Sequence, residues 1–300
     1  MPGFFLWCGH QAVGSGIAAS CTGDPMIAVL VASTAAAGPW VKAPGHAYMK
    51  AGYSRFSADT FVQPDGTEVA GTEYVGHTST LYGEVGLLDG LQLVFNTPFV
   101  GSRNIVDDVS YINRWGGDVN AGVEYGRSFG STPVSLQVLG KIPTYDNNDL
   151  SAYGNAAALF PAIGDGQVDL TALAAVGRGW SVGPIRGWVS TEVGYRHRTE
   201  IWAGDSSQPE RELVDGVPWT AQLGYSPRVK ERDLGWTFVS LGGINNFTTD
   251  DVTTQFIQAS VGGGFNIVGD LFAEVGYSDM IWTRASAPGG GISLGLSFNN

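Results

Sequence analysis

Residues 78–99 read TSTLYGEVGLLDGLQLVFNTPF, two alternating segments joined by Asp89-Gly90. Most apolar side chains of both segments occupy odd positions, whereas Thr80, Glu84 and Gln92 occupy even ones. Such alternation places apolar and polar side chains on opposite faces of an extended chain. Asp-Gly between two alternating segments is a strong signal for a tight hairpin turn. The stretch therefore predicts an antiparallel hairpin with one apolar and one polar face.

The same alternation recurs along the chain, and the connections between segments are alternately short and long. The segments are 45–58, 78–87, 91–99, 119–125, 134–138, 168–176, 185–198, 219–225, 236–244, 257–267, 271–277 and 292–298, of which 236–244 is ambiguous in phase. A sheet crosses lipid only when every backbone group is paired, which requires the strands to close on themselves. The sequence therefore predicts an all-β fold: a transmembrane, antiparallel, up-and-down β-barrel of about 12 strands with periplasmic termini, short periplasmic turns and long extracellular loops.

Composition agrees with this interpretation. The chain has 44 Gly, 11% aromatic and only 15% charged residues, which suits tight turns, aromatic girdles and a lipid-facing wall. A net charge of −12 argues against a nucleic-acid partner, because phosphates require a basic surface. We expect a bacterial outer-membrane location, contact with outer-membrane lipids and lipopolysaccharide, and recognition by the barrel-assembly machinery through Phe298. No cofactor motif is present in the sequence, and we expect no cofactor.

The N-terminus has the pattern of a targeting sequence. Met26 to Ala37 is apolar and ends in small residues, with Ala35 and Ala37 fitting a small-x-small cleavage site. The basic residues that usually precede such a segment are missing, since the first Lys or Arg is Lys42. We expect residues 1–37 to be an N-terminal extension and signal peptide, and residues 38–300 to form the barrel domain.

Charged residues fall on the inward face of several segments. The tripeptide Glu-x-Gly occurs at 84–86, 124–126, 192–194 and 274–276, each time with Glu inward. Buried carboxylates are costly unless they are paired, and basic residues are available at inward or end positions. We therefore expect an ion-pair lattice in the lumen, which would hold the barrel together or line a solute path. Its predicted members are Lys50, Glu84, Glu124, Arg127, Lys141, Arg186, Glu192, Arg196 and Glu274.

Aromatic residues suggest contacts with a solute. Trp188 and Phe272 have inward phase, although filling space is the alternative role for both. The longest connection, 143–166, is unusually apolar for a solvated loop and contains Tyr153 and Phe160. This loop could fold inward as a constriction or a hydrophobic entry site, which makes these four aromatic residues candidate solute contacts.

The run Gly164-Asp165-Gly166-Gln167-Val168-Asp169-Leu170, together with residues 122–129 (GVEYGRSF) and the Phe near the C-terminus, resembles the family of phenol-degradation meta-pathway outer-membrane proteins. These are distant relatives of the long-chain fatty-acid channels. The resemblance implies passive uptake of small hydrophobic or aromatic compounds. Fatty-acid channels carry an N-terminal hatch that plugs the lumen. Only a few residues separate Ala37 from the first segment here, so we expect no room for such a plug.

Two alternatives remain open. His77 and Ser79 share the outward face of one segment, similar to the His-x-Ser arrangement of outer-membrane phospholipase, with Ser as nucleophile and His as base. The third, orienting group has no good candidate, because Asn96 falls on the lumenal phase. The other alternative is a structural or adhesive barrel whose lumen is filled by side chains, since about twelve strands lie between the filled and the open kinds of barrel. A transporter rather than an enzyme is the favoured interpretation.

Overall fold

A computed structural model describes residues 38–114, 116–145, 160–161, 163–183, 185–202, 213–229, 232–247 and 253–300. The proposed signal peptide and Tyr153 lie outside these ranges. The strands are β1 (Ala47–Val62), β2 (Glu68–Leu88), β3 (Leu91–Val106), β4 (Val109–Arg114), β5 (Asp118–Phe129), β6 (Thr132–Pro143), β7 (Gln167–Val182), β8 (Ile185–Trp202), β9 (Gly216–Val229), β10 (Arg232–Asp233), β11 (Gly235–Asn246), β12 (Gln255–Val268), β13 (Leu271–Arg284) and β14 (Gly290–Asn299). No helix among the described residues is long and apolar enough to cross a membrane.

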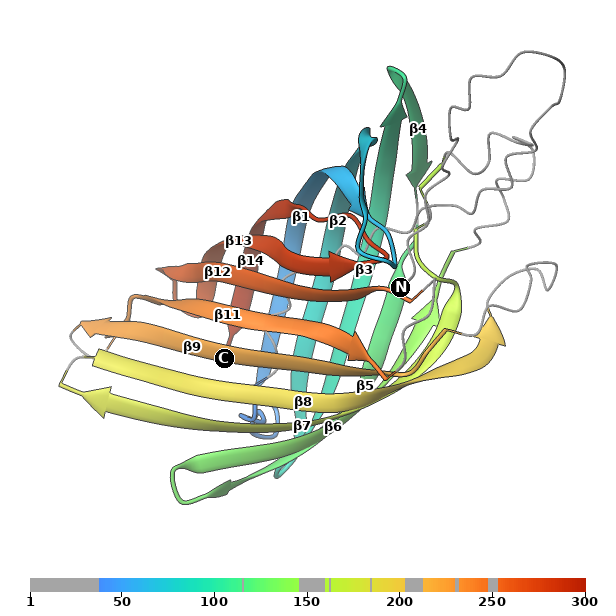
Figure 1. The fold of residues 1–300 in the computed structure, drawn as a ribbon. Helices are drawn as coiled ribbons and strands as arrows, with labels where there is room; N and C mark the ends of the chain where they lie inside the picture. The colour runs from blue at the N-terminus through green and yellow to red at the C-terminus, as the bar shows by residue number, and fades with distance from the viewer. Residues whose placement is uncertain are drawn as a thin grey trace, which may run out of the picture.

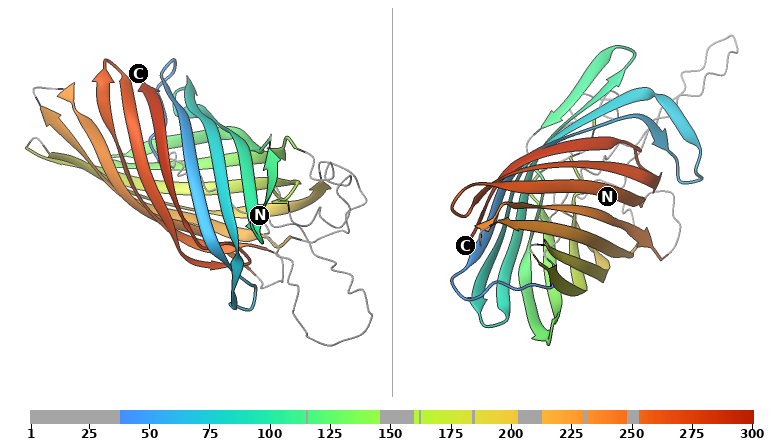
Figure 2. Two further views of the ribbon diagram at one scale, coloured as in Figure 1. Left: turned by 90° about the horizontal axis from the view of Figure 1, so that it is seen from above. Right: turned by 90° about the vertical axis from the view of Figure 1, so that its left-hand side faces the viewer.

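The strands close into a barrel, visible in Figures 1 and 2. Each neighbour in the ring pairs antiparallel with the next, and the first and last strands pair through contacts such as Ala51 with Leu296. Of the 14 described strands, β4 pairs only with β3 and β10 only with β9, so twelve strands form the ring. The predicted closed antiparallel barrel of about twelve strands is therefore confirmed.

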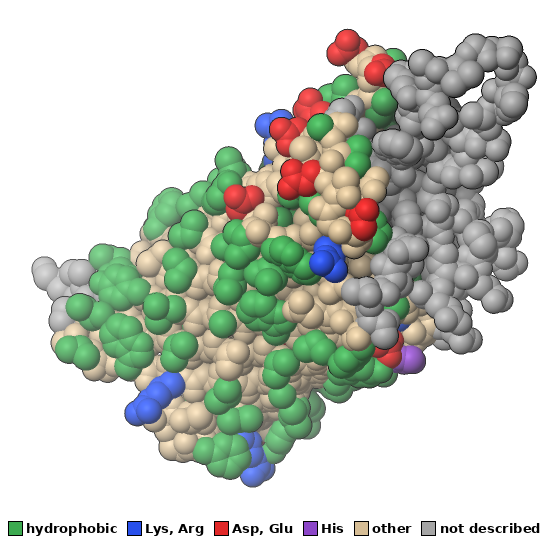
Figure 3. Space-filling view, in the orientation of Figure 1, with side chains coloured by type: hydrophobic (Ala, Val, Ile, Leu, Met, Phe, Trp, Pro, Cys, Tyr) green, Lys and Arg blue, Asp and Glu red, His purple; other side chains and the backbone are tan. Residues whose placement is uncertain are grey.

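The side chains alternate between the outer wall and the lumen. On β6, Leu136 is 62% exposed, whereas its neighbours Ser135 and Gln137 are 2% and 5% exposed. This reverses the pattern of a water-soluble protein, in which large apolar side chains are buried. Apolar side chains are spread across the visible wall in Figure 3. The ambiguous segment 236–244 lies in β11, with Val239 and Leu241 on the outer wall.

One end of the barrel, here called the turn end, carries tight connections. Residues 89–90, 130–131 and 269–270 each join two strands there, and Val182 pairs with Ile185 at the same end. Gly269 has φ of 55°, a backbone conformation that a residue without Cβ adopts easily. The start of β1 and the end of β14 also lie at this end, because Asn300 N donates to Ala47 O at 3.2 Å. The opposite end, the loop end, carries the longer connections.

A hairpin of β3 and β4 extends the wall at the loop end. The sequence predicts a polar connection over residues 101–113, but the structure forms a hairpin of β3 and β4 there (Figure 1). Asp107 and Asp108 have φ angles of 50° and 63°. A two-residue hairpin turn of type I′ requires positive φ at both residues. Strand pairing in β3 thus continues beyond residue 99, where the alternating segment ends.

An apolar cluster occupies part of the lumen near the loop end. Its members are Phe56, Ala58, Phe61, Tyr74, Met280 and Ala287, and Phe256 packs against it. Phe56 and Tyr74 come from paired strands, with ring centroids 6.0 Å apart. This cluster fills one side of the barrel interior near the loop end.

Candidate functional site in the lumen

A cavity of about 290 Å³ lies inside the barrel. It is lined by residues of β2, β3, β5, β6, β7, β8, β9, β11 and β12, so the surrounding wall includes most of the ring. The lining residues are Tyr82, Val94, Phe95, Asn96, Asn120, Gln137, Leu139, Thr171, Leu173, Glu192, Arg196, Pro218, Trp219, Thr220, Ser240, Gly242, Gly243, Phe256, Gln258 and Ser260. A space of this size approaches the volumes of small-molecule sites.

The cavity combines apolar and polar surfaces. Val94, Leu139, Leu173 and Phe256 supply apolar contacts, and amide and hydroxyl groups supply hydrogen-bonding partners. Two charged side chains also face the space, Glu192 and Arg196 on β8. They are four residues apart, and inward positions with this separation lie roughly 13 Å apart along a strand. A small molecule in the cavity can therefore place a ring against the apolar side chains and a polar substituent against the polar ones at the same time.

Above the cavity, towards the loop end, an ion-pair cluster crosses three strands. Lys141, Asp169 and Arg198 occupy directly paired positions on β6, β7 and β8. Lys141 Nζ lies 2.8 Å from Asp169 Oδ2, and Arg198 Nη1 lies 2.9 Å from the same oxygen. All three side chains are buried. A carboxylate between two cations is the arrangement that makes a buried charge tolerable.

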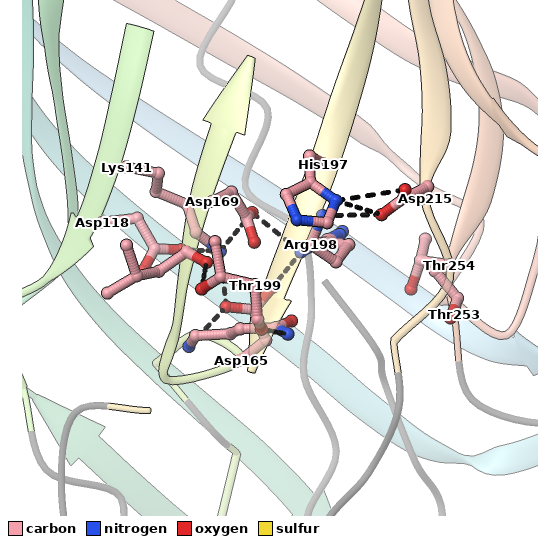
Figure 4. A network of polar contacts seen from close by, with 12 residues as sticks. Asp118, Lys141, Asp165, Asp169, His197, Arg198, Thr199, Asp215, Thr253 and Thr254 are labelled. Atoms are coloured by element: carbon pink, nitrogen blue, oxygen red, sulfur yellow. Dashed lines mark hydrogen bonds and ion pairs between the residues drawn. The ribbon is translucent and has the colours of Figure 1, made fainter. Parts of the chain in front are cut away.

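The connection between β6 and β7 contributes a second carboxylate, as Figure 4 shows. Asp165 Oδ1 lies 2.5 Å from Lys141 Nζ, and Asp165 Oδ2 lies 2.6 Å from Arg198 Nη1. Burial alone would raise the pKa of the Asp165 carboxyl, but Lys141 and Arg198 outweigh it and hold that pKa well below the ordinary value. The carboxylate is therefore ionised and fixed to the barrel wall.

Tyr145, just after β6, links Asp118 to the backbone of the connection that carries Asp165. Its hydroxyl donates to Asp118 Oδ1 at 2.8 Å and accepts from Gly166 N at 2.9 Å. Asp118 Oδ2 lies 3.9 Å from Lys141 Nζ. A Cβ at Gly164 would lie 1.9 Å from the Tyr145 hydroxyl, so only glycine fits there. The Gly-Asp-Gly run thus brings the backbone close enough for Asp165 to reach the lumen.

Other predicted lattice residues have separate partners. Lys50 Nζ lies 2.6 Å from Glu274 Oε2, and Tyr48 donates to the other oxygen of Glu274 at 2.8 Å. Glu84 accepts a hydrogen bond from Tyr82 at 2.7 Å. Glu124 accepts from Gln92 and Gln137, at 2.8 and 3.2 Å, instead of from a cation. The carboxylates of the lumen are therefore satisfied partly by ions and partly by neutral donors.

Two predicted members lie away from these groups. Arg127 is exposed near the turn end, with its guanidinium 5.7 Å from the centroid of the Tyr125 ring. Arg186 is exposed near the start of β8, also at the turn end. No carboxylate among the described residues forms an ion pair with either residue.

The candidate solute contacts do not meet in one place. Trp188 lies on the inner wall near the turn end, where its indole donates to Gln222 at 3.3 Å. Phe272 is half-buried at the turn end of β13. Phe160 packs edge-to-face on Tyr111 of β4, with centroids 5.5 Å apart. These three are not among the residues that line the cavity.

His77 and Ser79 both lie on the exposed outer face of β2. His77 Nδ1 is hydrogen-bonded to the Tyr53 hydroxyl at 2.6 Å, and the two rings stack. The contact gives His77 a structural partner on the neighbouring strand. Asn96, the weak candidate for a third group, lines the cavity on the opposite face of the wall.

Sequence reasoning missed the centre of the ion-pair cluster. It selected Lys141 but left out Asp118, Asp165, Asp169 and Arg198. A signal existed for three of them, because Asp118, Asp169 and Arg198 have inward phase. Asp165 lies outside every strand, and its inward position depends on how the connection folds. Within the described residues, no group of three or more His, Cys, Asp or Glu side chains is arranged to hold a metal ion.

The closed wall, apolar outside and polar inside, is the fold of bacterial outer-membrane β-barrel proteins. No protein-family model matches the sequence, and no curated protein matches it. Among solved structures, an outer-membrane channel from Pseudomonas putida F1 aligns over 87% of this chain and 97% of its own, with 14% identity and a TM-score of 0.57. The NanC porin aligns over 84% and 98%, with 8% identity and a TM-score of 0.48. At these identities the similarity concerns the fold.

Proposed function

We propose that this protein is a passive channel of the bacterial outer membrane for small solutes. The observation that carries the proposal is the cavity of about 290 Å³ inside a closed barrel whose outer wall is apolar. A wall with paired backbone groups and exposed Leu, Val, Ile and Phe side chains is stable in lipid and unstable in water. The cavity favours a barrel with a solute path rather than one whose lumen is filled by side chains.

The orientation follows from the two ends of the barrel. In bacterial barrels the short turns face the periplasm and the longer loops face outward. The turn end, with the start of β1 and the end of β14, would then be periplasmic. The ion-pair cluster would lie on the extracellular side of the cavity, where it holds residues 163–166 against the inner wall. Phe298, on the outer face of β14, would be the residue that the barrel-assembly machinery recognises.

The solute class that fits the cavity is a small aromatic compound with a polar substituent. Phe256, Leu139 and Leu173 offer contacts to a ring. Glu192 would accept a hydrogen bond from a hydroxyl group, and Arg196 would donate to an acidic one. This agrees with the resemblance to phenol-degradation outer-membrane proteins, and it favours transport over lipid hydrolysis at His77 and Ser79.

Block of single-channel current by phenol tests the solute class, with cyclohexanol as a non-aromatic control of similar size. We expect phenol to reduce the current more strongly than cyclohexanol. Phe256→Ala should weaken the block, whereas Phe265→Ala, on the outer face of the same strand, should leave it unchanged. Equal effects of the two compounds, or equal effects of the two variants, would contradict an aromatic site in the cavity.

A further inference from the structure

The residues that precede β1 lie inside the barrel mouth at the turn end. Pro39 is fully buried although it precedes the first strand, and Val41 and Lys42 are half-buried. Residues 38–46, here called the strap, run along the inner wall instead of leading away from the barrel. The view into the turn end in Figure 2 (right) shows this blue segment crossing the mouth.

The strap packs against glycines on the inward faces of three strands. A Cβ at Gly86 of β2 would lie 2.0 Å from Ala43 O, and one at Gly126 of β5 would lie 2.6 Å from Val41 Cγ2. At Gly177 of β7 a Cβ would lie 2.7 Å from Pro39 Cγ. A side chain at any of these positions would meet the strap where it now lies. The wall thus lacks side chains where the strap lies against it.

Hydrogen bonds fix the strap to the strands around the start of β1. Lys42 N donates to Gln92 Oε1 of β3 at 2.8 Å, and Lys42 Nζ donates to Asn299 Oδ1 of β14 at 2.7 Å. Gly45 and His46 exchange backbone hydrogen bonds with Gly86, at 3.1 and 2.9 Å. Lys42 therefore ties the strap to β3 and β14, the two strands that flank β1 and β2.

We propose that the strap is a built-in constriction that limits the size of the solutes and ions that pass the turn end, with Lys42 as its main anchor. The inference rests on the proposed channel function and assigns a permeability-determining role to residues 38–46. Pore diameter at the narrowest point governs passage. The strap occupies lumen space that glycine-lined walls leave open, so its removal widens the mouth without touching the strands.

Single-channel conductance of potassium chloride tests the role of the strap. We expect deletion of residues 38–43 in the full chain to raise conductance about two-fold or more. The double substitution Trp40→Gly with Lys42→Gly should give a smaller increase, and it preserves chain length if the deletion variant does not fold. Arg186→Ala, which removes a cation at the same end away from the strap, should leave conductance near that of the wild type.

A disulfide tests the position of the strap independently. Both native cysteines, Cys8 and Cys21, lie upstream of the strap. In a background with both replaced by Ser, Val41→Cys with Gly126→Cys should crosslink on oxidation of the folded protein, because a Cβ at position 126 would point at the side chain of residue 41. The locked channel should keep the conductance of the wild type.

The outcomes separate the strap from the channel function. If the wild type conducts but neither strap variant raises conductance, or if the crosslink does not form in the folded protein, the constriction is disproved and the channel remains. If neither the wild type nor the strap variants conduct, the proposed function itself fails. Conductance that appears only in the strap variants supports the constriction.

Discussion

Lys141 Nζ on β6 lies 2.5 Å from Oδ1 of Asp165, which belongs to the connection between β6 and β7. This pair links a residue outside the strands to the inner wall of the barrel. Arg198 of β8 binds the other oxygen of the same carboxylate, at 2.6 Å. The end of a long connection is therefore held in the lumen by two buried cations, next to the cavity through which we propose that solutes pass.

Asp165→Asn should destabilise the barrel, because it leaves Lys141 and Arg198 with less compensating charge. Removing one member of a buried ion pair costs about 3 kcal/mol or more. Urea unfolding in lipid vesicles, followed by tryptophan fluorescence, measures the loss. Asp108→Asn at the exposed tip of the β3–β4 hairpin is the control and should change stability little. Equal effects of the two variants would mean that the cluster does not hold the connection.

The contribution of Asp165 should disappear in acid. Its pKa in the folded protein lies below the ordinary value of 3.8, so the folded state favours the ionised carboxylate. A depressed pKa adds stability at pH values above 3.8, and this stability is lost as pH falls from there towards the folded-state pKa. The difference in unfolding free energy between wild type and Asp165→Asn should be largest at neutral pH and shrink below 3.8. A difference that is independent of pH contradicts an ionic role.

Glu192→Gln should reduce the preference of the channel for cations. The carboxylates of Glu84, Glu124 and Glu192 face the lumen, and no basic side chain of the described residues forms an ion pair with them. A ring of acidic side chains favours cations in a pore. Reversal potentials in a salt gradient measure the preference, with Glu73→Gln, exposed on the outer face of β2, as the control. Unchanged selectivity in Glu192→Gln would show that ions do not pass this residue.

Val138→Arg should prevent stable insertion, because Val138 lies on the outer face near the middle of β6. An arginine at the bilayer midplane costs roughly 2–4 kcal/mol, whereas one near the interface costs about 0–1. Leu88→Arg, at the turn end of β2, is the matched control. Folding into lipid vesicles, followed by the heat-sensitive shift in electrophoretic mobility, compares them. If both variants insert equally well, the outer wall does not face lipid.

Alternation in the sequence was sufficient to predict the barrel. The side chain of every second residue determines which face meets lipid, so residues such as Leu136 and Gln137 could be placed on opposite sides of the wall from their order alone. The number of strands in the ring followed from counting segments. The β3–β4 hairpin was missed, because pairing beyond the membrane needs no apolar face, and Asp107-Asp108 has the composition of a loop.

The site was less predictable for a physical reason. Phase shows that a residue points inward but not how far along the strand its partner lies. Lys50 and Glu274 could therefore be selected but not paired. Arg127 was selected because it lies near a strand end, although it has the outward phase of Tyr125. Asp165 and the strap lie outside the strands, where alternation gives no information. Phase could not indicate that residues 38–46, which have no regular structure, reach across the mouth from Gly177 of β7 to Gly86 of β2.

The central claim is that a closed wall encloses a path from one side of the membrane to the other. Current through planar lipid bilayers containing the purified, folded protein tests it most directly. We expect discrete, reproducible conductance steps that remain small in the wild type and increase when residues 38–43 are removed. Folded, inserted protein that gives no current, with or without the strap, would contradict the account.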